Sequence, residues 1–177
     1  MGRSVEVLPL LEIAPLPDQE PLRAVLARLH EFALVAFVSP NAIDAAFAHL
    51  PQWYHPWPAG VTLAVLGEGS RAALAAHGIT QEAVHIVSPG DAAHSDSEHL
   101  LRTLDLASLS GRPVLIVRGE SGRELIADGL RAAGAIVTTV AAYRRSVPPL
   151  TPALAARLRA LLAQPNDWIV TSSEALR

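Results

Sequence analysis

The sequence predicts an α/β fold in which five parallel strands form a doubly wound sheet, and three observations support this. Short apolar runs typical of buried strands alternate with amphipathic stretches of helical length. Turns containing serine or glycine follow most of these runs and lead directly into the next helix. Helices between successive strands imply parallel strands with helices on both faces of the sheet. We expect a flavodoxin-like winding with the strand order 2-1-3-4-5 along the sheet.

Each element has its own local signals. The expected strands occupy residues 34–38, 61–66, 84–87, 114–117 and 136–140, the last continuing toward 143–145. Asp18 and Pro21 precede the first helix, and Gly78 and Gly134 end two others. Ser95 and Glu98 have the spacing of a capping box. The expected helices cover residues 22–30, 42–50, 71–77, 97–106 and 123–133.

The pattern is interrupted after the fifth strand by Val147, Pro148 and Pro149. A further helix over 152–162 and a strand over 168–171 are expected beyond it. Residues 37–43 and 170–176 share an apolar run, a serine, an alanine and a branched aliphatic residue. This similarity predicts that a second α/β unit begins near Pro152.

The composition excludes several kinds of chemistry. The chain of 177 residues has no cysteine, and all 14 of its basic residues are arginine. Thiolate nucleophiles, zinc ribbons, Schiff bases and P-loop lysines are therefore excluded. A net charge of −3 argues against broad nucleic-acid binding. No apolar run is long enough to span a membrane, no signal peptide is recognisable, and the lack of cysteine suits the cytoplasm.

The candidate site lies at the carboxyl ends of the strands, where open parallel sheets bind ligands. Helix N-termini there favour anions, and Ser39, Ser70, Arg118 and Arg123 add donors. The simpler explanation, in which serines cap helices and glycines permit turns, is preferred on these residues alone. The segments concerned are 39–41, 67–70, 88–90 and 118–123.

Three other features have structural explanations that we prefer. Gly67 and Gly69 begin a dinucleotide-like pattern, but Ala72 replaces its third glycine. A metal site at His94, Asp96, Glu98 and His99 is less favoured than helix capping there. The aromatic stretch 53–58 is expected to be a surface loop, with a partner-binding patch as the second choice.

Six motifs in order along nearly the whole chain resemble the uroporphyrinogen-III synthase family. Each motif is weak by itself, and their order across the chain is the more specific signal. They are the segments 7–13, 38–43, 96–101, 114–125, 142–145 and 171–175.

The resemblance implies two similar α/β domains joined by a two-stranded linker. We expect residues 14–136 to form the continuous flavodoxin-like domain. Residues 5–13 and 137–146 would be the linker strands, and 147–177 a fragment of the second, discontinuous domain. Compared with the family, we expect this chain to be truncated at both ends, which leaves its activity open.

The resemblance also implies a function. Family members cyclise hydroxymethylbilane to uroporphyrinogen III, losing water and inverting ring D, through an azafulvene and a spiro intermediate. No metal or organic cofactor takes part. We therefore expect a cofactor-independent, monomeric, cytoplasmic lyase of haem and tetrapyrrole biosynthesis. The alternatives are a non-catalytic domain that binds an anionic ligand and, less favoured because no acidic cluster follows the first strand, a receiver domain.

Site residues are implied position by position. Tyr143 matches a tyrosine that faces the cleft, where it would assist departure of the hydroxyl group or pack at the hinge. Arg118 and Arg123 would contact substrate or, slightly favoured, brace their loop. Cleft serines and neighbouring residues complete the expected substrate-binding set, which is Ser39, Asn41, Gly67, Ser70, Arg118, Gly119, Arg123, Ser172 and Ser173.

Overall fold

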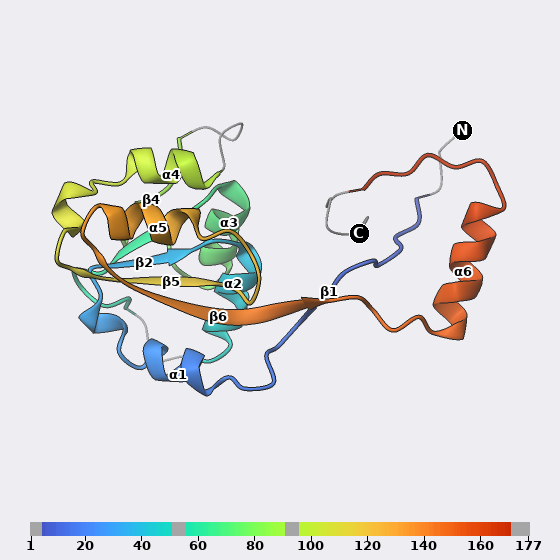
Figure 1. Cartoon of the computed structure of the whole chain (residues 1–177), viewed down its shortest axis with the longest axis horizontal. Helices are drawn as coiled ribbons and strands as arrows, with labels where there is room; N and C mark the ends of the chain where they lie inside the picture. Colours follow the sequence, from blue (N-terminus) through green and yellow to red (C-terminus); the bar gives the residue numbers. More distant parts are fainter. Residues whose placement is uncertain (1–4, 51–55, 91–95, 171–177) are drawn as a thin grey trace. The chain divides into compact units, whose positions relative to one another are not determined.

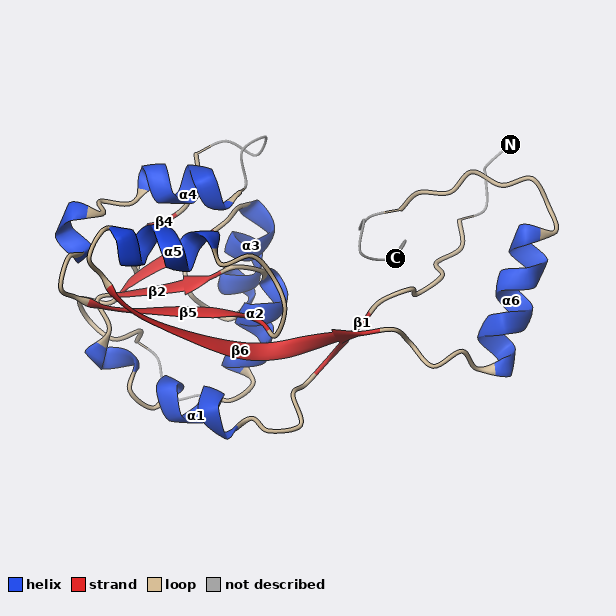
Figure 2. Cartoon of the chain, viewed as in Figure 1, coloured by secondary structure: helices blue, strands red, loops and turns tan. Residues whose placement is uncertain are grey.

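The computed structural model describes residues 5–50, 56–90 and 96–170. Strands and helices alternate along most of the chain (Figures 1 and 2). No helix in these described ranges is long and apolar enough to cross a membrane. The strands are β1 (Glu12–Ala14), β2 (Leu34–Phe37), β3 (Thr62–Val65), β4 (Ile86–Val87), β5 (Pro113–Gly119) and β6 (Ile136–Ser146). The helices are α1 (Glu20–Leu26), α2 (Pro40–Phe47), α3 (Glu68–Ala76), α4 (Ser97–Thr103), α5 (Leu125–Ala132) and α6 (Pro152–Leu162).

The sheet has six strands in the order β1-β6-β5-β2-β3-β4. The pairs β2–β3, β2–β5, β3–β4 and β5–β6 are parallel. The α/β class is therefore confirmed, but the expected number of strands was one too few, since β1 adds a strand beside β6.

The expected order of the five original strands was wrong. Numbered along the chain, β2 to β6 lie in the order 3-2-1-4-5 rather than 2-1-3-4-5. The chain adds β3 and β4 successively on one side of β2, and only then returns to place β5 on the other side. Apolar periodicity identifies buried strands but not the crossover that reverses direction, because right-handed crossovers are possible in either order.

Helices cover both faces of the sheet, and alternate side chains of the central strands fill two separate cores. Val35 and Phe37 of β2 pack with α1, α2 and α3, whereas Leu34 and Ala36 pack with α4 and α5. All four residues of β2 are buried, as expected for a central parallel strand. Placing β2 between β3 and β5 therefore explains its continuous apolar run.

Most expected elements are present, with shifted ends. The helix over 152–162 is confirmed, whereas residues 168–170 are not a strand. The tail supplies no neighbouring strand among the described residues to pair with them. Ser95, the expected cap, lies outside the described residues, and the N-cap of α4 is Asp96, which accepts a hydrogen bond from the His99 amide. A cap is defined by backbone dihedral angles, which the spacing of residues does not specify.

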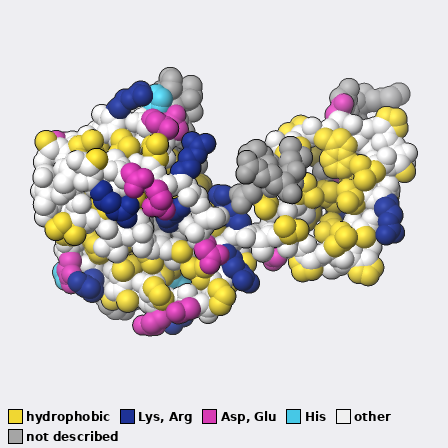
Figure 3. Space-filling model, in the orientation of Figure 1, with side chains coloured by type: hydrophobic (Ala, Val, Ile, Leu, Met, Phe, Trp, Pro, Cys, Tyr) yellow, Lys and Arg dark blue, Asp and Glu magenta, His cyan; other side chains and the backbone are white. Residues whose placement is uncertain are grey.

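Contacts divide the chain into two compact units, Pro15–Arg144 and a second unit formed by Met1–Ala14 with Arg145–Arg177. The first unit contains both apolar cores. In the second, α6 has no buried residue. Hydrophobic side chains are visible on the surface of this unit (Figure 3), and the exposed ones include Val147, Leu150, Leu162 and Ile169.

Candidate functional site

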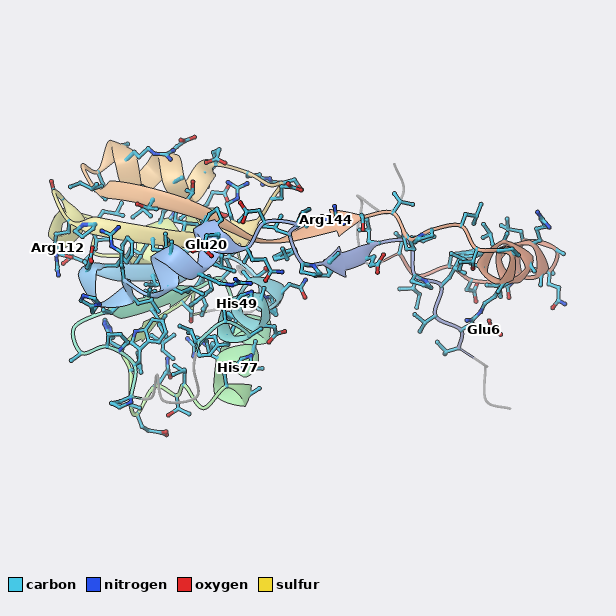
Figure 4. The ribbon with its side chains drawn as sticks, turned by 90° about the horizontal axis from the view of Figure 1, so that it is seen from below. Glu6, Glu20, His49, His77, Arg112 and Arg144 are labelled. Atoms are coloured by element: carbon cyan, nitrogen blue, oxygen red, sulfur yellow. The ribbon has the colours of Figure 1, made fainter. Side chains whose placement is uncertain are left out.

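The carboxyl ends of the parallel strands form one edge of the sheet, and most of the expected site residues lie there. Figure 4 labels one residue near each end of the strands. Arg112 lies just before β5, at the amino end, and Arg144 lies near the end of β6, at the carboxyl end. Since β2 and β5 are neighbours whose outgoing chains turn to opposite faces, the topological switch point lies between them. Open parallel sheets bind ligands beyond the carboxyl ends of the strands at such a point.

Tyr143 and Ser39 meet at this edge. Their side-chain oxygens, Oη and Oγ, are 3.1 Å apart. Ser39 is the N-cap of α2, and its Oγ also accepts a hydrogen bond from the Ala42 amide at 3.2 Å. Tyr143 is only 3% exposed and belongs to the core beneath α1–α3. The preferred capping role of Ser39 is thus observed, together with a contact that capping does not require.

A bulge in β6 determines the direction of the Tyr143 side chain. Arg118 of β5 is in register with Ala141, but the next residue, Gly119, is in register with Tyr143, so that β6 contains one extra residue. Val140, Ala142 and Tyr143 consequently all belong to the same core, which strict alternation would not allow. The bulge therefore brings Tyr143 to the face on which Ser39 begins α2.

Gly119 provides the space for the tyrosine ring. A Cβ atom at this position would lie 3.0 Å from Tyr143 Cζ and 3.1 Å from Oη. Carbon atoms essentially never approach one another more closely than this, so an alanine would require the buried ring to move. The backbone is fixed here as well, because the Glu120 amide donates to the Tyr143 carbonyl oxygen at 2.8 Å. Gly119 therefore has a packing role in the arrangement of the site.

Arg118 braces the loop that joins β5 to α5. The residue is 9% exposed, and its guanidinium forms an ion pair with Glu124. Gly122 has φ +146°, and a Cβ atom there would lie 3.0 Å from Arg118 Nη2. The guanidinium thus lies against a glycine in a conformation that other residues rarely adopt. Arg123, in the same loop, is exposed.

The residues described so far form one part of this edge, which we call the tyrosine end. It consists of Ser39, Arg118, Gly119 and Tyr143.

The other predicted residues that the structure describes are distributed along the same edge. Asn41 lies in the first turn of α2 and is half-buried. Gly67 is the N-cap of α3 and supplies no side chain to it. Ser70 lies inside α3 and is 4% exposed, so that it is not a cap. Ser172 and Ser173 lie outside the described residues.

Arg71 and Ser88 form a second contact at this edge that the sequence did not single out. Arg71 lies in the first turn of α3, after β3, and Ser88 directly follows β4. Arg71 Nε donates to Ser88 Oγ at 2.7 Å, and Nη2 donates to the same oxygen. We call this pair the arginine end. The segment 88–90 was predicted to lie at this edge, but nothing in the spacing linked it to Arg71.

The structure favours helix capping over metal binding near α4. Asp96 Oδ1 accepts from the His99 amide at 2.9 Å and lies 2.7 Å from His99 Nδ1. His94 lies outside the described residues. Within 5–50, 56–90 and 96–170, no group of three or more histidines and carboxylates is arranged to hold a metal ion.

Comparison with known proteins places this arrangement in a family. The family model described as uroporphyrinogen-III synthase HemD matches residues 1–177. The Escherichia coli K12 uroporphyrinogen-III synthase is 34% identical over 145 residues, which are 82% of this chain and 56% of that protein. The Synechococcus elongatus enzyme is 32% identical over 153 residues, 85% of this chain and 55% of that protein.

The fold agrees as well. The crystal structure of uroporphyrinogen III synthase from the extremely thermophilic bacterium Thermus thermophilus matches with a TM-score of 0.56 and 19% sequence identity. The match covers 85% of this chain and 54% of that structure. The chain thus spans about half the length of these relatives. Since the family model matches the whole chain, the protein belongs to the uroporphyrinogen-III synthase family.

Proposed function

We propose that this chain acts as a uroporphyrinogen-III synthase, cyclising hydroxymethylbilane to uroporphyrinogen III with loss of water and inversion of ring D. Family membership supports the reaction, and the observation that carries the assignment to a site is the contact between Tyr143 Oη and Ser39 Oγ. We propose further that residues 14–136 form one of two similar α/β domains, that the enzyme needs no cofactor, and that it is a cytoplasmic monomer.

The first chemical step needs a group that helps hydroxide to leave. Breaking the C–O bond leaves its electron pair on oxygen, and the pyrrole nitrogen supplies electrons to the carbon as an azafulvene forms. Tyr143 would donate a hydrogen bond to the departing oxygen, which leaves as water once it has gained a proton. Ser39 can donate to Tyr143 Oη while its own oxygen accepts from the Ala42 amide. The phenol would then be oriented before the substrate binds.

The other requirement of the reaction is that the protein binds and orients the substrate. The substrate carries acetate and propionate groups, and the edge of the sheet presents arginines and helix N-termini to carboxylates. Tyr143 is 3% exposed, so this proposal requires the edge to open around Oη as the substrate binds. Amide hydrogen exchange at residues 118–122, measured with and without ligand, follows such an opening.

The test is an isomer assay. Hydroxymethylbilane is generated in place by its synthase. The uroporphyrinogens formed are then oxidised to porphyrins and separated into type I, the spontaneous product, and type III. We expect type III with the native chain and a slower rate with Tyr143→Phe. Only type I with the folded chain would overturn the proposal. Binding of the tetrapyrrole without any turnover would instead support the non-catalytic alternative.

A further inference from the structure

The arginine end contains a charged group that is held in place without a described counter-ion. Arg71 is half-buried, and its described partner is the neutral hydroxyl of Ser88, which is itself 7% exposed. Ser88 Oγ accepts from Arg71 and donates to the Pro89 carbonyl oxygen at 3.5 Å. The hydroxyl therefore has both an acceptor and a donor role in the contact.

In the described ranges, Arg71 and Arg118 are the two arginines that are not exposed, and of these two Arg118 has a carboxylate partner. Arg118 pairs with Glu124, Arg28 with Glu31, and Arg131 with Asp128. No ion pair to a carboxylate is found for Arg71 within the described ranges. Removing part of the water from a guanidinium costs free energy that a neutral hydroxyl recovers only in part. Arg71 is thus a half-buried arginine on this edge whose charge an added carboxylate would balance.

The geometry leaves donors for such a carboxylate. A guanidinium carries five N–H groups, and the contact with Ser88 uses one on Nε and one on Nη2. The other N–H groups remain in the plane of a side chain whose orientation Ser88 already fixes. Binding an anion there would cost little side-chain entropy, which is how preorganised sites gain affinity.

We propose that Arg71 binds a carboxylate of the substrate, an acetate or propionate group of the tetrapyrrole, and that Ser88 positions it. The inference rests on the proposed function, since it assigns one part of that substrate to the ends of β3 and β4. Arg71 would hold the periphery of the ligand, away from the tyrosine end where the bond is broken. The role is one of binding and orientation, so Arg71 takes no part in proton transfer.

The test uses the native chain and uroporphyrin III, a stable tetrapyrrole carrying acetate and propionate groups. Fluorescence titration of the porphyrin gives Kd for the native chain and for Arg71→Gln, Arg71→Lys and Ser88→Ala. The control is Arg131→Gln, which removes the same charge from an exposed pair on α5. Circular dichroism melting of every variant separates loss of binding from loss of folding.

We expect Arg71→Gln to raise Kd about tenfold, as a charge-assisted hydrogen bond implies, and the control to change it less than about twofold. Arg71→Lys should recover part of the loss, because it restores charge without the planar fork. Ser88→Ala keeps the charge of Arg71 but removes the hydroxyl that orients it, and should raise Kd about threefold. A second titration at high salt should reduce the difference between the native chain and Arg71→Gln.

Two results would overturn the inference, and they differ. If the native chain binds uroporphyrin III and folded Arg71→Gln binds equally well, Arg71 has no role in binding while the proposed function stands. If the folded native chain does not bind the porphyrin at all, both the proposed function and the role of Arg71 are overturned.

Discussion

The tyrosine end and the arginine end each contain an arginine, but the two arginines have different partners. At the tyrosine end, Arg118 is neutralised by Glu124, and the ring of Tyr143 fills the space above Gly119. At the arginine end, Arg71 is held by a serine hydroxyl and keeps its charge uncompensated by a described carboxylate. An internally satisfied arginine stabilises a loop, whereas one oriented by a neutral partner is prepared for a ligand.

The largest expected effect tests the packing at the tyrosine end. Gly119→Ala should lower the free energy of unfolding by about 2 kcal/mol, because the new Cβ would lie against a buried ring. Urea denaturation measures the loss. Gly69→Ala is the control, since its Cβ would meet Pro40 Cγ at an ordinary 3.6 Å within α3, and it should be neutral or stabilising. Equal stability of the two variants would show that Gly119 is not needed for the ring.

The second prediction tests whether Arg118 acts mainly within the fold. Arg118→Gln should lower the free energy of unfolding by about 1.5 kcal/mol, because the substitution removes a charge-assisted hydrogen bond to Glu124 from a side chain that is 11% exposed. Arg131→Gln, which breaks a pair exposed on both sides, should cost less than about 0.5 kcal/mol. Thermal and urea unfolding of both variants gives the comparison. A larger loss for Arg131→Gln would contradict the bracing role of Arg118.

The third prediction concerns the hydrogen bond between Ser39 and Tyr143. In a double-mutant cycle of Ser39→Ala and Tyr143→Phe, the coupling free energy should be about 0.5–1 kcal/mol. Ser39→Ala alone should cost more, because it also removes the cap of α2. Additive effects of the two substitutions would mean that the hydroxyls are not coupled in solution.

The smallest effect comes from an exposed ion pair away from both parts of the edge. The Arg28 guanidinium lowers the pKa of Glu31, chiefly through their side-chain hydrogen bond, and Glu31 in turn raises the pKa of Arg28. A lowered carboxyl pKa adds stability above the pKa of the unfolded chain, and this is lost as the pH falls through the folded value.

Carbon-13 titration of the Glu31 carboxyl measures this effect. We expect its pKa to lie below the usual range in the native chain and to return toward it in Arg28→Gln. The same pKa in both chains would show that the pair does not persist in solution. Because both groups are exposed, the pair serves as the reference for the Arg118–Glu124 pair, in which only the arginine is buried.

Much of the architecture could be predicted because it follows from local patterns. The apolar runs at 34–38 and 114–117 identified two buried central strands, and the helix expected over 42–50 is present as α2, which begins two residues earlier, at Pro40. The strand order could not be predicted, because the choice of crossover depends on which strand edge the chain pairs with after β4. The Arg71–Ser88 contact was missed for the same reason, since it joins residues following two strands whose adjacency is tertiary.

The sequence by itself determined the α/β class, the position of most helices and strands, and the family resemblance, because these depend on residue type and periodicity within short segments. Only the tertiary structure decided which side chains meet. Strict alternation along β6 would separate Tyr143 from the face of Ala142. The bulge opposite Gly119 puts both on one face and brings Tyr143 to Ser39. A bulge is set by pairing with the neighbouring strand, so no pattern within β6 alone specifies it.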